Sequence, residues 1–123
     1  MKKSEIKKLD IIWSKLVKEK AGRKCECCLE TEVWLESAHI IGRTYRATRW
    51  GCWIEGAYDL NGMCLCSACH REYDEHRPKE LFIRKVVIGL ERYERLCEQK
   101  KIIAKDQDFK TIENLLKGMG NGR

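Results

Sequence analysis

Apolar residues recur every three or four positions near both ends of the chain, which is the spacing of an amphipathic helix. In the first stripe, Leu9 and Trp13 alternate with lysine-rich polar positions, and the pattern predicts a helix over about residues 4–21. Two later stripes predict helices over about residues 78–100 and 108–117. The chain therefore has helical ends around a middle segment of a different kind.

The middle segment begins with a stretch that is dense in β-branched and aromatic residues, Glu32 to Ile41. It is too short for a typical helix, so its later part is predicted to be a strand. The alternation of side chains along a strand places Ser37, His39 and Ile41 on one face. Together with the helical ends, this strand indicates one α+β domain over residues 1–123.

Length, charge and cysteine content narrow the class of protein. A chain of 123 residues fits one domain with a modest core, and 25 Lys and Arg against 19 Asp and Glu give a net charge of +6, which favours an anionic partner. The amino terminus has no apolar signal-peptide stretch, and no run approaches about 18 apolar residues, so we expect an intracellular, cytoplasmic protein without a membrane span. In a reducing compartment, the 8 cysteines are expected to bind metal.

Two Cys-x-x-Cys pairs mark the ends of the middle segment. The pairs are Cys25 with Cys28, and Cys66 with Cys69. Two residues between thiolates let a tight turn direct both sulfurs at one tetrahedral ion, and a second such turn completes a closed, structural zinc site. The alternative is a set of buried or redox-active thiols. Either Cys27 or Cys64 could replace a neighbouring cysteine as a zinc ligand. Cys97 lies on the apolar side of a predicted helix and is interpreted as a core residue.

Three short motifs lie between and just after these pairs. They are Ser-Ala-His-Ile-Ile at 37–41, Asp-Leu-Asn-Gly-Met-Cys-Leu-Cys at 59–66, and Cys-His-Arg-Glu-Tyr-Asp at 69–74. In their order and joint spacing the motifs resemble the HNH endonuclease family, with His39, Asn61 and His70 at the three named positions. The resemblance covers about residues 25–76. It implies a ββα-metal core, or His-Me finger, in which two strands and a helix surround the active site beside the four-cysteine zinc knuckle.

The resemblance implies a metal-dependent DNA endonuclease that leaves 5′-phosphate and 3′-hydroxyl ends, similar to compact nucleases of phages and mobile elements. His39 is expected to be the general base, because a neutral imidazole can take a proton from water near neutral pH. His70 and, one helical turn later, Asp74 are expected to hold a catalytic Mg²⁺, Mn²⁺ or Ni²⁺. Asn61 is expected to fix the loop and to orient His39.

One position departs from the family pattern. Many members place an Asp or a second His directly before the general base, as a further metal ligand, whereas this chain has Ala38. Glu36, on the same predicted strand face, is a candidate replacement. The departure also sustains a rival interpretation, in which the chain is a non-catalytic, zinc-finger-like module that binds nucleic acid.

The loop after His39 carries arginines at three-residue steps, with aromatic residues between them. The arginines are Arg43, Arg46 and Arg49. Guanidinium groups and aromatic rings in this arrangement suit contacts with the phosphates and bases of DNA. The alternative is a stretch of solvated arginines above packed tryptophans. The sequence leaves open whether the protein is a monomer or a homodimer.

Overall fold

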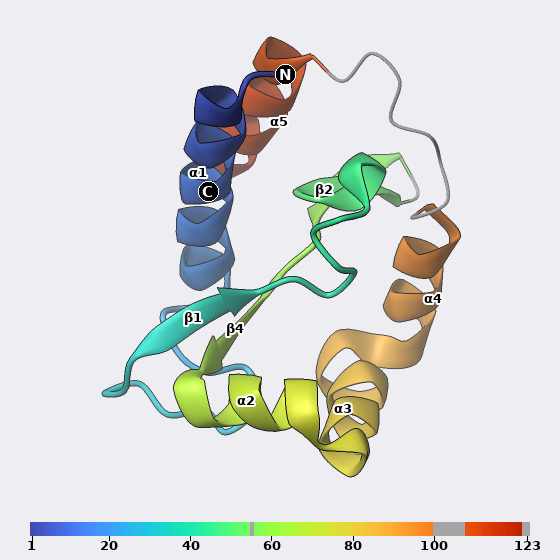
Figure 1. Cartoon of the computed structure of the whole chain (residues 1–123). Helices are drawn as coiled ribbons and strands as arrows, with labels where there is room; N and C mark the ends of the chain where they lie inside the picture. The colour runs from blue at the N-terminus through green and yellow to red at the C-terminus, as the bar shows by residue number, and fades with distance from the viewer. Residues whose placement is uncertain (55, 100–107, 122–123) are drawn as a thin grey trace.

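The structure is a computed structural model, and it describes residues 1–54, 56–99 and 108–121. Within these residues the fold is α+β, with two small antiparallel sheets and helices at both ends, which confirms the predicted class at this level (Figure 1). In chain order the elements are α1 (Lys3–Lys20), β1 (Leu35–Ala38), the 3-10 turn η1 (Arg46–Thr48), β2 (Gly51–Ile54), β3 (Ala57–Leu60), β4 (Met63–Cys66), α2 (Ser67–Glu75), α3 (Arg77–Phe82), the π-helical segment η2 (Ile83–Gly89), α4 (Leu90–Gln99) and α5 (Phe109–Asn121). Among the described helices, none has the length and apolarity needed to cross a membrane.

The first sheet pairs β1 with β4 and lies between α1 and α2, which pack on its two sides (Figure 1). The strands are antiparallel, with Glu36 opposite Leu65 and Ser37 opposite Cys64. Ser37 faces α1, because its hydroxyl group donates to the backbone carbonyl of Ser14 at 3.0 Å. Glu36 faces the other way, as alternation along a strand requires. A strand is confirmed in the predicted stretch, but it ends at Ala38. Ile41, predicted on the face of Ser37 and His39, lies instead in the core towards α2. After β4 the chain enters α2 without a break.

Two hydrophobic cores lie on the two sides of this sheet. The core beneath α1 and α5 contains Leu9, Trp13, Leu16, Val17, Trp50, Leu60, Cys64 and Leu116. The core towards α2 and the helices after it contains Cys25, Ala38, Ile40, Ile41, Cys52, Met63, Leu65, Cys66, Cys69, Tyr73, Ile83, Ile88 and Leu96. The predicted core role of Trp13 is confirmed, since its side chain is 3% exposed. The short β1–β4 sheet therefore has both faces covered, which fixes the direction of every side chain along it.

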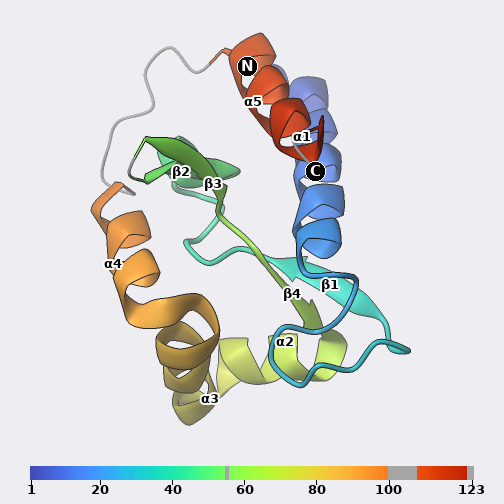
Figure 2. The same ribbon diagram turned by 180° about the vertical axis from the view of Figure 1, so that it is seen from behind.

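The second sheet is a hairpin of β2 and β3, in a segment that the sequence predicts to be a loop (Figure 2). Gly51 lies opposite Leu60 at its base. A Cβ atom at Gly51 would collide with the backbone carbonyl of Asp59 and lie 2.9 Å from the ring of Tyr58, so only glycine lets the strands approach here. The strands are short and carry charged and glycine residues, and for that reason they show no clear strand pattern in the sequence.

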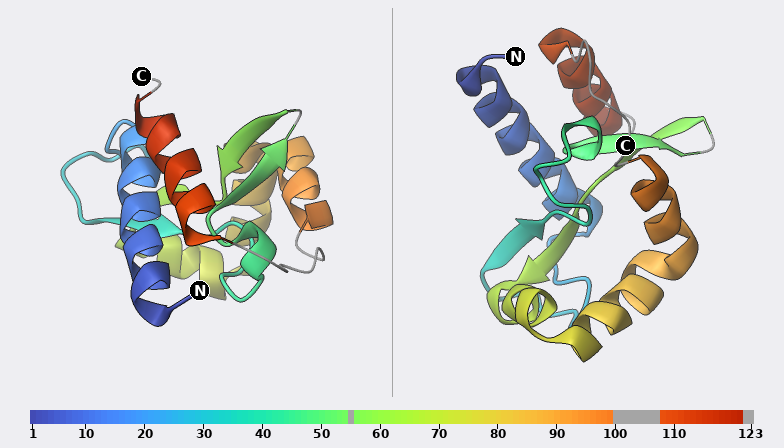
Figure 3. Two further views of the ribbon diagram at one scale, coloured as in Figure 1. Left: turned by 90° about the horizontal axis from the view of Figure 1, so that it is seen from above. Right: turned by 45° about the vertical axis from the view of Figure 1, so that its right-hand side comes forward.

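The predicted helix over residues 78–100 is divided into α3, η2 and α4, and the path bends between them (Figure 3). The bend has a local cause, because Gly89 has a φ angle of +92°, which side chains other than glycine rarely adopt. The apolar pattern could not predict this bend, because the apolar residues on both sides of Gly89 keep the spacing of one continuous helix. The other two helix predictions agree with α1 to within one residue at each end, and with α5 at its start, although α5 continues to Asn121.

Charged clusters attach α1 to the rest of the chain. The carboxylate of Glu113 on α5, whose side chain is 2% exposed, lies 3.1–3.5 Å from the ammonium groups of Lys8, Lys110 and Lys117. These cations, Lys8 first, lower the pKa of Glu113 to about 2. Asp59 on β3 accepts hydrogen bonds from Lys20 of α1 at 2.9 Å and from Arg92 of α4 at 2.8 Å. The packing of α1 beside α5 is visible from above (Figure 3).

Candidate functional site

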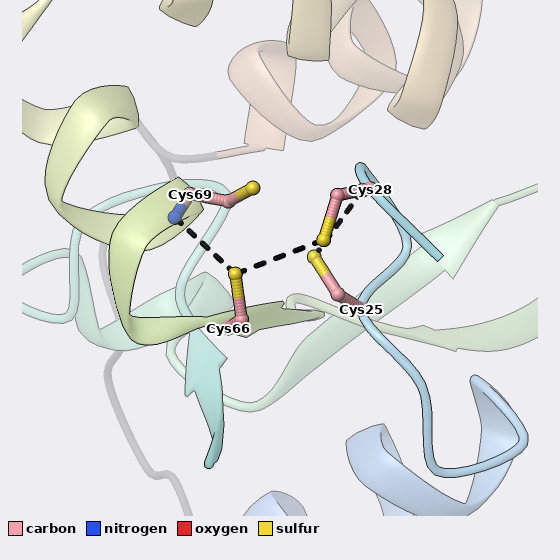
Figure 4. Close-up of side chains that lie close together, drawn as sticks. All are labelled: Cys25, Cys28, Cys66 and Cys69. Atoms are coloured by element: carbon pink, nitrogen blue, oxygen red, sulfur yellow. Dashed lines mark hydrogen bonds between the residues drawn. The ribbon is translucent and has the colours of Figure 1, made fainter. Parts of the chain in front are cut away.

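Four cysteines from distant parts of the chain come together beside the β1–β4 sheet (Figure 4). They are the two predicted pairs, Cys25 with Cys28 and Cys66 with Cys69, and their sulfur atoms all lie within 4.8 Å of one another. The first pair lies in the loop after α1, and the second joins the end of β4 to the first turn of α2. A group of this geometry could hold one tetrahedral ion, and four thiolates are typical ligands of zinc. The predicted cluster is confirmed.

Backbone N–H groups donate to two of the four sulfur atoms, and among the four thiols the pKa of Cys25 is lowered whereas burial raises that of Cys69. The N–H group of Cys28 donates to the sulfur of Cys25, and that of Cys69 donates to the sulfur of Cys66, both at 3.4 Å. Burial raises the pKa of the Cys25 thiol, but backbone N–H groups, that of Cys28 first, outweigh burial and lower the pKa to about 7. Zinc binds thiolates, and its binding releases the protons of the remaining thiols, so four cysteine sulfurs in this arrangement fit a structural zinc ion.

The remaining four cysteines stand outside the group that the described residues form. Cys64 is fully buried against α1, and burial raises the pKa of its thiol to about 11. Cys27 packs against the other core and interacts with the ammonium group of Lys79. Cys52 lies in that core, and Cys97 packs against it, as predicted. The group that could hold an ion therefore consists of the two Cys-x-x-Cys pairs, without the substitutes that the sequence left open.

His39 follows β1 directly and stacks on Trp13 of α1, with ring centroids 4.0 Å apart and planes inclined by 16°. Burial is the main cause that lowers the pKa of His39 to about 4; the positive charges of Arg49 and Arg43 add to it, and the charge of Asp10 opposes it. The Nε2 atom of His39 and the Nε1 atom of Trp13 are buried, and neither has a hydrogen-bond partner among the described residues. His39 is thus a neutral imidazole at pH 7.

The shifted pKa of His39 predicts a pH dependence of stability. A histidine with a pKa of 6.5 in the unfolded chain and about 4 in the fold takes up its proton more readily when unfolded. The contribution of His39 to the free energy of unfolding is therefore fully present above pH 6.5. It falls by about 3 kcal/mol as the pH drops towards 4. Urea unfolding of wild type and His39→Gln over this range tests it, with His76→Gln as the control. We expect the decrease in the free energy of unfolding to be smaller by about 3 kcal/mol in His39→Gln, but not in His76→Gln. The same pH dependence of the free energy of unfolding in all three proteins would contradict this prediction.

Asn61 lies in the loop before β4, and its side chain holds the loop after His39. The amide nitrogen donates to the carbonyl of Ile41, and the amide oxygen accepts from the N–H group of Ile41, both at 2.8 Å. The next residue, Gly62, packs so closely on α1 that a Cβ atom would lie 2.6 Å from Val17. Asn61 therefore fixes the loop as expected, through Ile41 and, at 3.4 Å, through the carbonyl of Arg49. The expected side-chain hydrogen bond from Asn61 to His39 is not observed among the described residues.

Removal of the Asn61 amide should weaken the fold. Asn61 is fully buried, so Asn61→Ala leaves both backbone groups of Ile41 without these partners in a buried position. We expect a loss of about 2–4 kcal/mol in the free energy of unfolding, measured by urea denaturation. The control is Asn114→Ala on the exposed side of α5, for which we expect a change of less than about 0.5 kcal/mol. A similar small change for Asn61→Ala would show that the two hydrogen bonds contribute little.

His70 follows Cys69 in the first turn of α2, and its ring lies between two carboxylates. Its Nδ1 atom is 2.9 Å from Oε1 of Glu36 on β1, and its Nε2 atom is 3.6 Å from Oδ2 of Asp74, one turn later on α2. The expected proximity of His70 and Asp74 is therefore observed. His70 and Glu36 lie on the α2 side of β1, whereas His39 contacts α1 on the other side.

The three arginines of the loop differ in their surroundings. Arg49 forms a two-fold contact with Asp10 of α1, through Nε at 3.0 Å and Nη2 at 2.7 Å, and its side chain is 19% exposed. Asp10 also accepts from the indole of Trp50 at 2.8 Å. Arg43 and Arg46 are exposed. The guanidinium group of Arg49 therefore attaches the loop to α1, and the phosphate contacts of Arg43 and Arg46 stay a prediction.

Comparisons with protein-family models, with curated proteins and with solved structures give no match for this chain. The assignment of roles to the histidines therefore depends on the motifs and on the geometry above. Sequence reasoning did not identify Asp10 or Trp13 as neighbours of His39, because helical spacing reports only that one side of α1 is buried. It offered Glu36 as a candidate for the missing metal ligand, whereas the structure places this carboxylate 2.9 Å from His70 Nδ1.

Proposed function

We propose that this protein is a metal-dependent endonuclease of the HNH type, which hydrolyses DNA phosphodiester bonds to leave 5′-phosphate and 3′-hydroxyl ends. The observation that carries the proposal is the position of Asn61, whose amide joins the two strands at the end where His39 leaves β1. The same strand pair leads directly into α2, which begins beside the cysteine cluster and bears His70. A ββα-metal core has this order of strand, strand and helix.

In this proposal His39 is the general base. It is neutral at pH 7, and its unpartnered Nε2 atom belongs to a ring stacked on Trp13, whose N–H group also has no partner among the described residues. A water molecule that donates to His39 and accepts from Trp13 would satisfy both atoms. A phosphate near Arg43 adds negative charge, which raises the pKa of His39 from about 4 towards the neutral range where general bases work best.

His70 and Asp74 are the proposed ligands of a second metal ion. An imidazole nitrogen and a carboxylate oxygen suit Mn²⁺ and Ni²⁺, and water completes the shell for Mg²⁺. Asp74 is exposed and can turn towards substrate, while His70 is held by the backbone next to Cys69. When bound, a divalent cation supplies positive charge that stabilises the phosphate and the leaving 3′ oxygen. The zinc ion at the cysteines keeps β4 and α2 in place and takes no part in the reaction.

A groove along α1 supports DNA as the anionic partner. It has a volume of about 420 Å³ and is lined by Lys7, Asp10, Ile11, Ser14, Lys15, Lys18 and Arg23. Four of these residues are cationic, and the single acidic residue, Asp10, is paired with Arg49. Asp10 and Ser14 lie on either side of Trp13 in the sequence, so the groove leads to the helix that covers His39. The cationic side chains of this groove suit contacts with a phosphate backbone.

One observation favours a second candidate, a zinc-stabilised module that binds nucleic acid without cleaving it. His39 and His70 contact different helices on opposite sides of β1, and Ala38 offers no ligand atom between them. The Nε2 atom of His39 is also covered in this conformation. A binding module needs only the basic surface and the zinc-stabilised fold, both of which this candidate shares with the nuclease.

A plasmid-nicking assay tests the proposal against this second candidate. Zinc-loaded protein is incubated with supercoiled plasmid in Mg²⁺, Mn²⁺ or Ni²⁺, and the control reaction contains no added divalent cation. We expect nicked or linear plasmid in at least one metal, and we expect DNA ligase to reseal the nicks, because ligation requires a 5′-phosphate and a 3′-hydroxyl end. DNA binding without cleavage in every metal would contradict the nuclease proposal and support the binding module.

A further inference from the structure

Glu36 and His70 form a contact that neither the zinc cluster nor the general base requires. The two residues are 34 positions apart, and the fold brings Glu36 Oε1 to 2.9 Å from His70 Nδ1. Their side chains are 37% and 28% exposed, so the contact is partly shielded from solvent. Asp74 lies on the other side of the ring, 3.6 Å from Nε2. The imidazole of His70 thus has a carboxylate at each nitrogen.

This geometry argues against Glu36 as a ligand of the same ion as Asp74. The two nitrogen atoms of an imidazole point in opposite directions, so an ion at Nε2 lies on the far side of the ring from Oε1 of Glu36. Among the described residues, the cysteines are the group whose ligand atoms gather within 4.8 Å, and Glu36, His70 and Asp74 do not gather in this way. Glu36 therefore contacts the ring at the nitrogen that faces away from the proposed ion.

A carboxylate in this position has a known physical effect on a metal-binding histidine. The Nδ1–H group donates to the carboxylate, which fixes the ring orientation and the tautomer and leaves the lone pair on Nε2. We propose that Glu36 is a positioning residue that holds His70 with Nε2 directed at a divalent cation shared with Asp74. This inference depends on the cation site of the proposed function, and it explains how one histidine and one exposed carboxylate suffice although Ala38 offers no ligand.

The alternative is an ordinary contact that only attaches α2 to β1. Such a contact would affect folding only. Substitution of Glu36 would then change neither the tautomer of His70 nor the affinity for the metal ion. The two interpretations therefore differ in measurements that need no nuclease activity. The variants are Glu36→Ala, which removes the acceptor, and Glu36→Gln, which keeps a neutral acceptor of the same shape. Glu75→Ala on α2 is the matched control, because it removes one exposed carboxylate from the helix that bears His70.

The first measurement is the ¹⁵N spectrum of the imidazole rings in zinc-loaded protein without a second metal ion. We expect wild-type His70 to show a protonated Nδ1 and an unprotonated Nε2 at pH 8, and Glu36→Ala to show a mixture of both tautomers. A wild-type His70 that is protonated at Nε2 would overturn the proposal without any variant. This spectrum keeps the proposal testable if Glu36→Ala does not fold.

The second measurement is Mn²⁺ binding to the zinc-loaded protein by isothermal titration calorimetry. We expect Glu36→Ala to weaken Mn²⁺ binding about 10–100-fold, as loss of such partners does in other metal sites. Glu36→Gln should lose only part of this affinity, and Glu75→Ala should match wild type. Absence of Mn²⁺ binding to wild type, or unchanged binding in Glu36→Ala, would overturn the inference. Failure of plasmid nicking with these binding results intact would instead count against the nuclease function alone.

Discussion

Cys28→Ser is expected to lose the bound zinc and to unfold the region between α1 and α2. The sulfur of Cys28 lies 3.8 Å from that of Cys66, which ends β4 and precedes α2. The cluster therefore links the loop after α1 to the sheet, in addition to the hydrogen bonds between Glu26 and Cys64. Zinc contributes on the order of 10 kcal/mol to the folding of small zinc modules, which is comparable with the whole stability of a domain of this size. Elemental analysis for zinc and circular dichroism measure the two effects.

The neighbouring cysteine supplies the control. Cys27→Ser changes the same kind of side chain one position earlier, but the sulfur of Cys27 stands outside the four-cysteine group. We expect Cys27→Ser to keep about one zinc ion per chain and to remain folded. Strong chelation of the wild type should reproduce the unfolding of Cys28→Ser. If reduced wild-type protein without zinc stays folded, or if both variants bind zinc equally, the cluster is not a structural metal site.

The helical ends and the cysteine cluster could be predicted from the sequence because both depend on short, regular spacings. The apolar stripe that contains Leu9 and Trp13 needs only the period of a helix, and α1 forms where the stripe predicts. The two Cys-x-x-Cys pairs need only a tight turn each, and one ion selects the pairing between them. Strand alternation likewise predicted that Ser37 and His39 share a face, and both contact α1.

Features that depend on a single backbone angle or on distant partners could not be predicted. Gly89 divides the long carboxyl-terminal helix through one positive φ angle, and glycine in a helical stripe does not report which angle it will adopt. The hairpin of β2 and β3 depends on the close approach at Gly51, which is a property of the paired strands and not of either segment alone.

The candidate site shows the same limit in its charged residues. Arg49 belongs to a regular series of loop arginines, but Asp10, 39 positions earlier, pairs with it in the fold. The sequence offers Glu36 as a candidate metal ligand, but in the fold its carboxylate lies 2.9 Å from His70 Nδ1, a contact between positions 34 residues apart that spacing does not predict. The spacing of arginines along the sequence suggests a surface that binds phosphate. It does not show which arginine forms an ion pair inside the fold, as Arg49 does with Asp10.

His39→Ala should abolish DNA cleavage and leave DNA affinity nearly unchanged. The substitution removes the proposed proton acceptor, and loss of a general base lowers the rate about 100- to 10,000-fold. The basic groove along α1 and the exposed Arg43 and Arg46 are untouched, so the dissociation constant for DNA should stay within about three-fold of wild type, well below a change of 1.4 kcal/mol. Single-turnover cleavage and fluorescence anisotropy measure the two quantities separately.

Two controls separate a chemical role of His39 from a structural one. His76→Ala removes the exposed histidine at the junction of α2 and α3 and should cleave DNA like wild type. His39→Ala also leaves a space beside Trp13, against which the imidazole stacks at 4.0 Å, so added imidazole can enter this space and accept the proton. We expect partial recovery of cleavage that rises with the concentration of imidazole base. A folded His39→Ala protein that cleaves DNA at the wild-type rate would show that another group accepts the proton.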